Sequence, residues 1–121
     1  MNARDYWNAH YRRTNLEMNP NLNIFESIFN KYQNQIFSPV LDLGCGEGKL
    51  LNFLNQRGIF HLVGVDISDV AISLAKKEYP GINFLVGDIY NLKNLFEKNF
   101  FSFITSSRHY IIKTIKHRET P

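Results

Sequence analysis

The stretch Val40-Leu41-Asp42-Leu43-Gly44-Cys45-Gly46-Glu47-Gly48 decides the fold class. Its first four residues form a short apolar run that favours a buried strand, and three glycines at alternate positions then end that strand. Glycine lets the chain turn sharply and brings the backbone close to a ligand. Residues 49–57 place Leu50, Leu51 and Leu54 on one side, which predicts a helix. A glycine loop between a strand and a helix is typical of a nucleotide-binding site.

The same alternation of strand and helix continues downstream. Apolar runs predict further strands at residues 60–65, 82–86 and 100–105. Between the first two of these, Ser68 or Asp69 is a candidate cap of another helix, and residues 91–97 suit a short helical turn. Such alternation predicts an open, mostly parallel α/β sheet with helices on both faces. Ligands bind such sheets beyond the carboxyl ends of the strands.

The chain divides into three segments around this pattern. Residues 1–37 mix aromatic and charged side chains at helical spacing and predict an N-terminal helical cap. Residues 38–107 form the α/β core, and residues 108–121 form a basic C-terminal tail. We expect no strand after the fourth, so the sheet is predicted to be truncated there with one edge of the fourth strand open. An open apolar edge invites pairing, so we expect self-association or a completing partner.

Composition indicates a cytoplasmic protein that binds no metal. The single cysteine, Cys45, excludes an internal disulfide framework and fits a reducing compartment. No apolar run approaches the roughly 20 residues that span a bilayer, and the first residues lack the apolar core of a signal peptide. The four histidines are scattered without the close spacing of metal ligands.

The net charge of +3 comes entirely from residues 101–121, because residues 1–100 are balanced. A basic tail attracts phosphate, so a nucleic-acid partner stays open. A solvated chain end is the simpler interpretation.

Three motifs in order resemble those of class I S-adenosylmethionine-dependent methyltransferases. Residues 40–48 resemble the first motif of that family, Val63-Gly64-Val65-Asp66-Ile67-Ser68 the second, and Gly87-Asp88-Ile89-Tyr90 the third. The resemblance covers roughly residues 36–105. It implies a Rossmann-like methyltransferase sheet, S-adenosylmethionine as cofactor, and methyl transfer to an acceptor that the sequence does not identify.

The resemblance also implies roles for individual residues around the adenosine. Asp66, 20 residues past Gly46, would accept hydrogen bonds from the ribose hydroxyls; a helix cap or a turn aspartate is the alternative. Asp88 would accept a hydrogen bond from the adenine amino group, and Ile67 and Ile89 would lie against the adenine ring. Ordinary core packing is the alternative for Ile67.

Other residues are expected near the methionine part of the cofactor. Asp42 would complement its positive charge or order the glycine loop. Tyr11, in the N-terminal cap, is a candidate contact of the methionine carboxylate; simple amphipathic packing is the alternative. The floor of the pocket is assigned to the loop residues Gly44, Cys45, Gly46 and Gly48. The Cys45 thiol is expected to pack rather than react.

The sequence departs from the family after the fourth strand. The family's sheet has seven strands, and no Asn/Asp-Pro-Pro-Tyr/Phe motif follows here, which argues against amino-methylation of a nucleic-acid base by that route. Methyl transfer from a sulfonium depends largely on alignment, so no catalytic base is named. Two alternatives stay open: a module that binds the cofactor without turnover, and a fragment of an NAD-dependent oxidoreductase. Lys49 and Asp88 argue against the latter.

Overall fold

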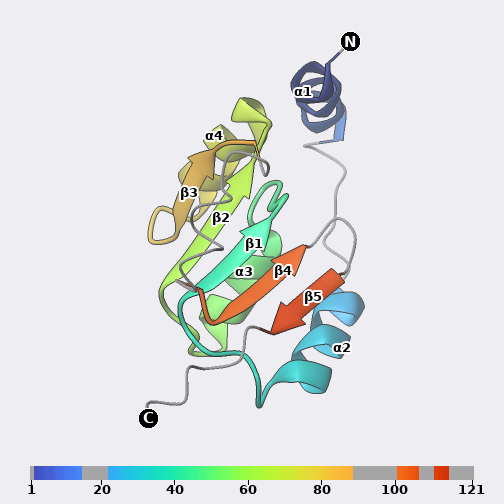
Figure 1. Ribbon diagram of the computed structural model, residues 1–121. Coiled ribbons are helices and arrows are strands. Elements are labelled where there is room, and N and C mark those ends of the chain that lie inside the picture. The colour runs from blue at the N-terminus through green and yellow to red at the C-terminus, as the bar shows by residue number, and fades with distance from the viewer. Residues whose placement is uncertain (1, 15–21, 89–100, 107–110, 115–121) are drawn as a thin grey trace.

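The computed structural model describes residues 2–14, 22–88, 101–106 and 111–114, as Figure 1 shows. Its helices and strands, in chain order, are α1 (Ala3–Thr14), α2 (Leu22–Tyr32), β1 (Val40–Leu43), α3 (Lys49–Gln56), β2 (Leu62–Asp66), α4 (Asp69–Glu78), β3 (Asn83–Val86), β4 (Phe103–Ser106) and β5 (Ile111–Thr114). The predicted helical turn at residues 91–97 lies outside the described residues. None of the helices in the described ranges is both long and apolar enough to cross a membrane.

The strands form one sheet in the order β3-β2-β1-β4-β5. Strands β1 to β4 are parallel, and Asp42 at the end of β1 pairs with Gly64 on one side and Thr105 on the other. The carboxyl ends of β1, β2 and β3 therefore meet at one edge of the sheet, the upper edge in Figure 1. This arrangement confirms the predicted α/β, Rossmann-like and mostly parallel fold class.

The fifth strand corrects two expectations. Residues 111–114 pair antiparallel with β4, with Ile111 opposite Ser106 and Thr114 opposite Phe103. The expectation that no strand follows the fourth is therefore wrong, and so is the expectation that this edge of β4 is open. The physical reason is composition: Ile111, Ile112 and Thr114 are β-branched and favour a strand, although the surrounding basic residues suggested a solvated tail.

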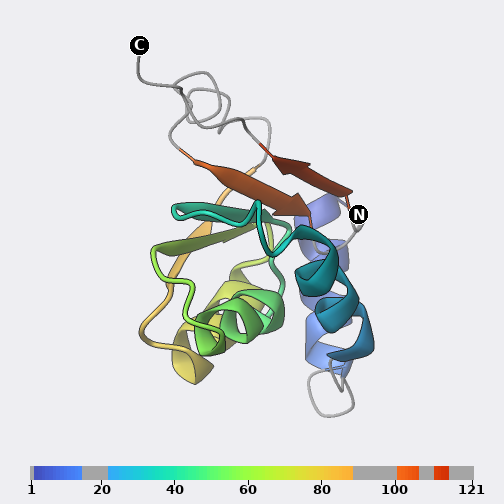
Figure 2. The ribbon, with the colours of Figure 1, turned by 90° about the horizontal axis from the view of Figure 1, so that it is seen from below.

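Helices α2, α3 and α4 cover one face of the sheet, as the view in Figure 2 shows. The leucines of α3 and the β1 residue Val40 are buried in the core cluster on this face. Phe53 of α3 contacts Phe25 and Phe29 of α2, with ring centroids 5.7 and 6.3 Å apart. These aromatic contacts fix α2 beside α3, because offset and edge-to-face rings attract beyond their burial.

A second, smaller cluster forms around β1, β2 and β4. It consists of the buried residues Leu41, Val65, Phe101 and Ile104. Alternate residues of β1 and β2 thus belong to different clusters, which explains why these strands read as continuous apolar runs rather than as alternating ones.

Candidate functional site

The glycine loop folds back over the end of β2. The backbone nitrogens of Gly44 and Cys45 both donate to the carbonyl of Val65, at 2.8 and 3.0 Å. Gly46 and Gly48 have φ values of 57° and 84°, in the left-handed region that favours glycine. The loop residues that the sequence assigned to the pocket floor therefore lie directly beside the second motif.

Asp66 connects the three motifs. Its Oδ2 accepts a hydrogen bond from the nitrogen of Gly46 at 2.8 Å, and its Oδ1 accepts one from the nitrogen of Ser68 at 2.9 Å. Its backbone carbonyl accepts a third from the nitrogen of Gly87 at 3.0 Å. The side chain is 2% exposed. In this structure Asp66 organises the turns around it, while its role toward a ribose stays a prediction.

The turn after β2 is fixed by the cap of α4. Ser68 is the N-cap, and its hydroxyl accepts a hydrogen bond from the nitrogen of Ala71 at 3.0 Å. Capping satisfies backbone donors that a helix start otherwise leaves unpaired. Of the two cap candidates in the sequence, the structure selects Ser68, and Asp69 becomes the first residue of the helix.

An open hollow of about 410 Å³ lies at the carboxyl edge of β2 and β3. Ile67, Gly87 and Asp88 line one side, and residues 2–4 at the start of α1 line the other. The structure thus brings two predicted adenine-contacting residues, Ile67 and Asp88, to one hollow. A hollow of this volume falls within the range of small-molecule sites. The sequence analysis named Tyr11 in this N-terminal segment and did not single out the first turn of α1, which lines the hollow.

Asp42 lies buried behind the glycine loop and bonds to a residue that the sequence did not single out. The Thr105 hydroxyl donates to Asp42 Oδ1 at 2.8 Å, and the two side chains are 2% and 0% exposed. The contact exists because β4 pairs beside β1 and places Thr105 opposite Asp42. The contact could be predicted only from the order of the strands, because the spacing of Asp42 and Thr105 along the chain does not indicate it.

The remaining predicted site residues divide between the core and the undescribed part of the chain. Cys45 is 5% exposed and belongs to the main core cluster, where its Sγ packs against β2 at Gly64. Its side chain therefore packs, as the sequence analysis expected of the thiol. Ile89 and the side chain of Tyr11 lie outside the described residues.

One carboxylate beside the site has a shifted pKa. A hydrogen bond from the Asn8 side chain, backbone hydrogen bonding and the charges of Arg4 and Arg12 together hold the pKa of Asp69 below its ordinary value of 3.8. Asp69 therefore remains ionised at neutral pH at the interface between α1 and α4.

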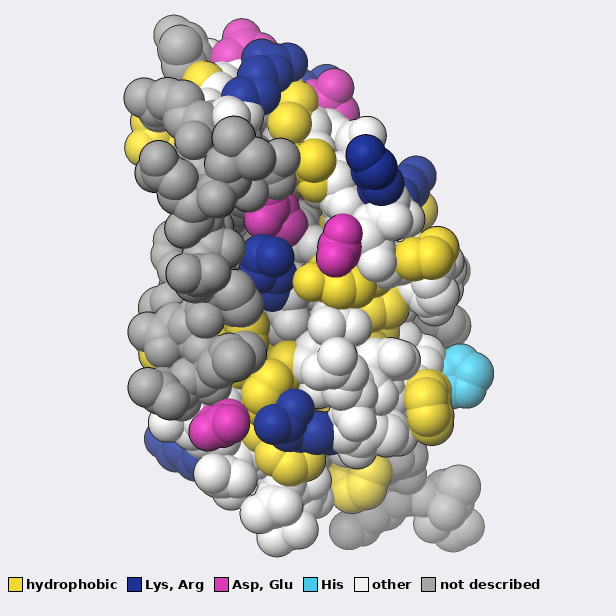
Figure 3. All heavy atoms as spheres, turned by 180° about the vertical axis from the view of Figure 1, so that it is seen from behind, with side chains coloured by type: hydrophobic (Ala, Val, Ile, Leu, Met, Phe, Trp, Pro, Cys, Tyr) yellow, Lys and Arg dark blue, Asp and Glu magenta, His cyan; other side chains and the backbone are white. Residues whose placement is uncertain are grey.

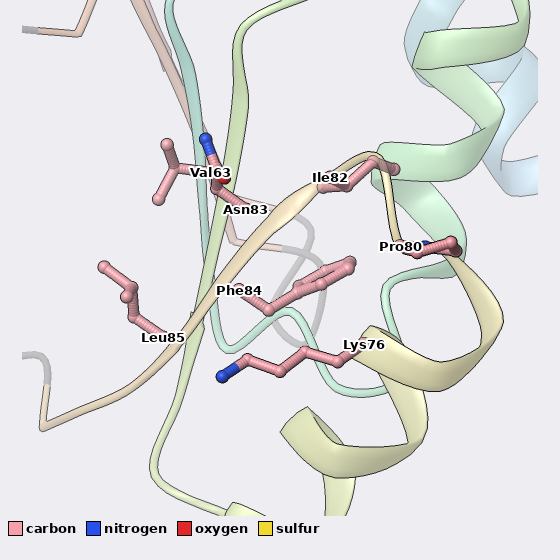
Figure 4. A pocket seen from close by; sticks show the side chains of 7 residues that line it. All are labelled: Val63, Lys76, Pro80, Ile82, Asn83, Phe84 and Leu85. Carbon is pink, nitrogen blue, oxygen red and sulfur yellow. The ribbon is translucent and has the colours of Figure 1, made fainter.

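A larger hollow of about 580 Å³ runs along β3, and Figure 4 shows its lining side chains. Phe84 and Ile82 point to one side of the strand, with Lys76 of α4 alongside them, while Val63 and Leu85 point to the other. Lys76 is the one charged side chain in this lining. Ligand sites usually combine an apolar lining with several convergent polar groups, so we assign no site here.

Charged side chains of both signs lie on the surface of the described ranges. Lys and Arg are interspersed with Asp and Glu on the face shown in Figure 3. Among the described residues, no three His, Cys, Asp or Glu side chains gather in a way that would hold a metal ion.

Comparison with known proteins agrees with this geometry. A family model described as a methyltransferase domain matches residues 40–119, which include all three strand-end motifs. The chain belongs to this methyltransferase domain family. In sequence, the methyltransferase domain is 38% identical over 55 residues to protein 235L of Invertebrate iridescent virus 6, whose name marks it as a candidate methyltransferase. That match covers 43% of this chain and 20% of the viral protein.

Two solved methyltransferase structures share the fold. A SAM-dependent methyltransferase from Anabaena variabilis superposes with a TM-score of 0.62 at 21% identity, covering 88% of this chain and 48% of that one. The plantazolicin methyltransferase BamL, solved with SAH, gives a TM-score of 0.54 at 28% identity, over 74% of this chain and 38% of BamL. The methyltransferase domain described here thus spans less than half the length of these structures.

Proposed function

We propose that this methyltransferase domain binds S-adenosylmethionine at the carboxyl edge of β1, β2 and β3 and holds it for methyl transfer. The observation that carries the proposal is the carboxylate of Asp66, which joins the glycine loop to the turn beside the hollow. The bound SAH of BamL, a relative at 28% identity, supports the same ligand class.

The described residues fit an adenosine in size and chemistry. Ile67 offers an apolar contact and Asp88 an acceptor within one hollow. A carboxylate oxygen accepts more than one hydrogen bond, so Asp66 is suited to receive ribose hydroxyls beside the backbone nitrogens that it already accepts from. In this proposal the adenine lies between Ile67 and Asp88, and the ribose lies toward Asp66.

The methionine end is assigned to the glycine loop. The loop's backbone approaches a ligand without side-chain obstruction, and the buried carboxylate of Asp42 behind it complements a cationic group. S-adenosylmethionine supplies an electrophilic methyl group on a sulfonium. The role of these residues is to hold and align it, since proximity and alignment provide much of the acceleration in such transfers.

Calorimetric titration with S-adenosylhomocysteine and, separately, with NAD tests the ligand. We expect saturable binding of S-adenosylhomocysteine and none of NAD; binding of NAD alone would favour the oxidoreductase alternative. Asp88→Ala should weaken S-adenosylhomocysteine binding about 10-fold, the effect of losing one hydrogen bond to a charged acceptor. Asp66→Ala is a less clean test, because it also removes the acceptor of two buried backbone nitrogens.

Glu78→Gln is the matched control, because Glu78 is an exposed acid at the far end of α4. If Asp88→Ala binds S-adenosylhomocysteine with wild-type affinity, the assignment of Asp88 to the adenine amino group is wrong. Formation of S-adenosylhomocysteine from S-adenosylmethionine with pools of small-molecule, peptide and RNA acceptors then separates a transferase from a module that only binds.

A further inference from the structure

Among the described side chains of helix α1, a buried polar one, Asn8, contacts the rest of the molecule. Asn8 is 7% exposed, whereas the other described side chains of α1 are exposed or half-buried. In Figure 1, α1 lies at the carboxyl edge of the sheet, beside α4. A buried polar amide needs hydrogen-bond partners, so the bonds of Asn8 bear on where α1 lies.

The Asn8 amide is bonded at both of its ends. Its Oδ1 accepts hydrogen bonds from the Ser68 hydroxyl and, at 3.4 Å, from the nitrogen of Val70. Its Nδ2 donates to Asp69 Oδ1 at 2.7 Å. All three partners belong to the cap and first turn of α4, so the Asn8 side chain connects α1 to the start of that helix.

These bonds continue into the proposed cofactor site. Ser68 donates its backbone nitrogen to Asp66 Oδ1, and Asp66 Oδ2 accepts from the nitrogen of Gly46. Asn8, Ser68, Asp66 and Gly46 thus form a continuous hydrogen-bonded chain from α1 to the glycine loop. We call these four residues the α1–loop chain.

The first turn of α1 also forms one wall of the hollow. Arg4 Nε donates to the carbonyl of Ile67 at 3.1 Å, and residues 2–4 face Ile67, Gly87 and Asp88 across the hollow. Helix α1 is therefore both held by the turn after β2 and placed where it closes the adenosine end of the proposed site.

We propose that Asn8 is a positioning residue that docks α1 over this hollow, so that docking of α1 and binding of an adenosine-bearing ligand stabilise one another. The coupling rests on the proposed function. The reason is linkage: a ligand that contacts α1 only when α1 is docked must favour the docked state, and docking must raise the affinity by the same factor.

The test uses the full chain and a reciprocal exchange of polar groups. Asn8→Ala removes all three bonds of the side chain. Asn8→Asp keeps the acceptors but sets a carboxylate against Asp69, and the double variant Asn8→Asp/Asp69→Asn restores a donor opposite that carboxylate. Asp5→Asn is the control, because Asp5 is exposed on the same turn of α1 as Arg4.

Two measurements are made on each protein: affinity for S-adenosylhomocysteine by calorimetry, and amide hydrogen exchange of α1 and α3 without ligand. In wild type, we expect ligand to slow exchange in α1. Asn8→Ala and Asn8→Asp should weaken binding about 10-fold and speed exchange in α1 while leaving α3 unchanged. The double variant should return both quantities to near wild type, as should the control.

Wild-type affinity in Asn8→Ala would overturn the coupling, and unchanged exchange in α1 would overturn the docking role. Equal loss of protection in α1 and α3 would assign Asn8 to general stability and overturn the proposal as well. If wild type does not bind S-adenosylhomocysteine, the proposed function fails and the coupling with it. The exchange of α1 in the free variants still decides whether Asn8 docks the helix.

Discussion

Asp66 Oδ2 lies 2.8 Å from the backbone nitrogen of Gly46 and accepts a hydrogen bond from it across 20 residues of chain. Both groups are buried, so the bond is shielded from water and costly to lose. Through it the first two sequence motifs form one structural unit, and the carbonyl of Asp66 adds Gly87 of the third. We expect this unit and the bonds that support it to determine much of the domain's stability.

Replacing Asp66 with Asn should destabilise the fold. An amide has one acceptor oxygen where the carboxylate has two, so either Gly46 or Ser68 loses the acceptor of its buried nitrogen. We expect the free energy of unfolding to fall by about 1–3 kcal/mol, measured by urea denaturation. Glu78→Gln, on the exposed end of α4, serves as control. Equal urea midpoints for wild type and Asp66→Asn would contradict this account.

Alanine substitution at two glycines with similar φ values distinguishes the cost of a steric clash from the cost of backbone strain. Gly48 and Gly58 have φ values of 84° and 85°, but a Cβ at Gly48 would lie 2.5 Å from Cζ of Phe84, whereas one at Gly58 meets nothing within 4 Å. Both alanine variants incur the left-handed strain of about 1 kcal/mol. Gly48→Ala should lose roughly a further 1–3 kcal/mol through overpacking. Thermal unfolding of the pair measures the difference, and similar losses would show that Phe84 moves aside easily.

Thr105 is expected to stabilise the buried carboxylate of Asp42. Thr105→Val keeps the shape of the side chain but removes the hydroxyl that donates to Asp42 Oδ1. The expected loss is about 1–3 kcal/mol in the free energy of unfolding, measured in denaturant. Thr105→Ser retains the donor and should lose clearly less. A larger loss in the serine variant would mean that the methyl group, and not the hydroxyl, matters at this position.

Acid should release α1 through Asp69. Its pKa is lowered in the folded chain, so the unfolded chain takes up this proton first as the pH falls, and folding loses stability. The contribution of Asp69 to folding stability is fully present above pH 3.8, its ordinary pKa. It is lost as the pH falls through the lower pKa of the folded chain. The fluorescence of Trp7, the one tryptophan of the chain and a residue of α1, should report the change. In Asp69→Asn the acid transition should shrink; an identical transition would assign it to other carboxylates.

The fold could be predicted from sequence where local signals and core packing agree. The glycine loop, the apolar run of β1 and the cap at Ser68 each express a local backbone requirement, and the parallel order follows from alternation of strands and helices. The fourth strand was expected at residues 100–105 but begins at Phe103. Phe101 is buried in the smaller cluster before the strand starts, so apolar residues alone do not mark its beginning.

The contacts that connect distant parts of the chain could not be predicted. Asn8 reads as one polar residue on an amphipathic helix, and only the docked helix places it beside Ser68, 60 residues later. Thr105 likewise gains its role from pairing with β1. β5 was missed because a four-residue strand in a basic segment has little intrinsic preference beyond its β-branched residues, and its pairing with β4 decides the outcome.

The reversed direction of β5 determines where a label or support should be attached. Because Thr114 lies opposite Phe103, the chain leaves this strand at the start of β4, the side of the sheet away from the proposed cleft. The other terminus enters α1, whose first turn lines the hollow. A label attached at Thr114 should therefore leave ligand entry unhindered, whereas one attached at Asn2 would crowd it.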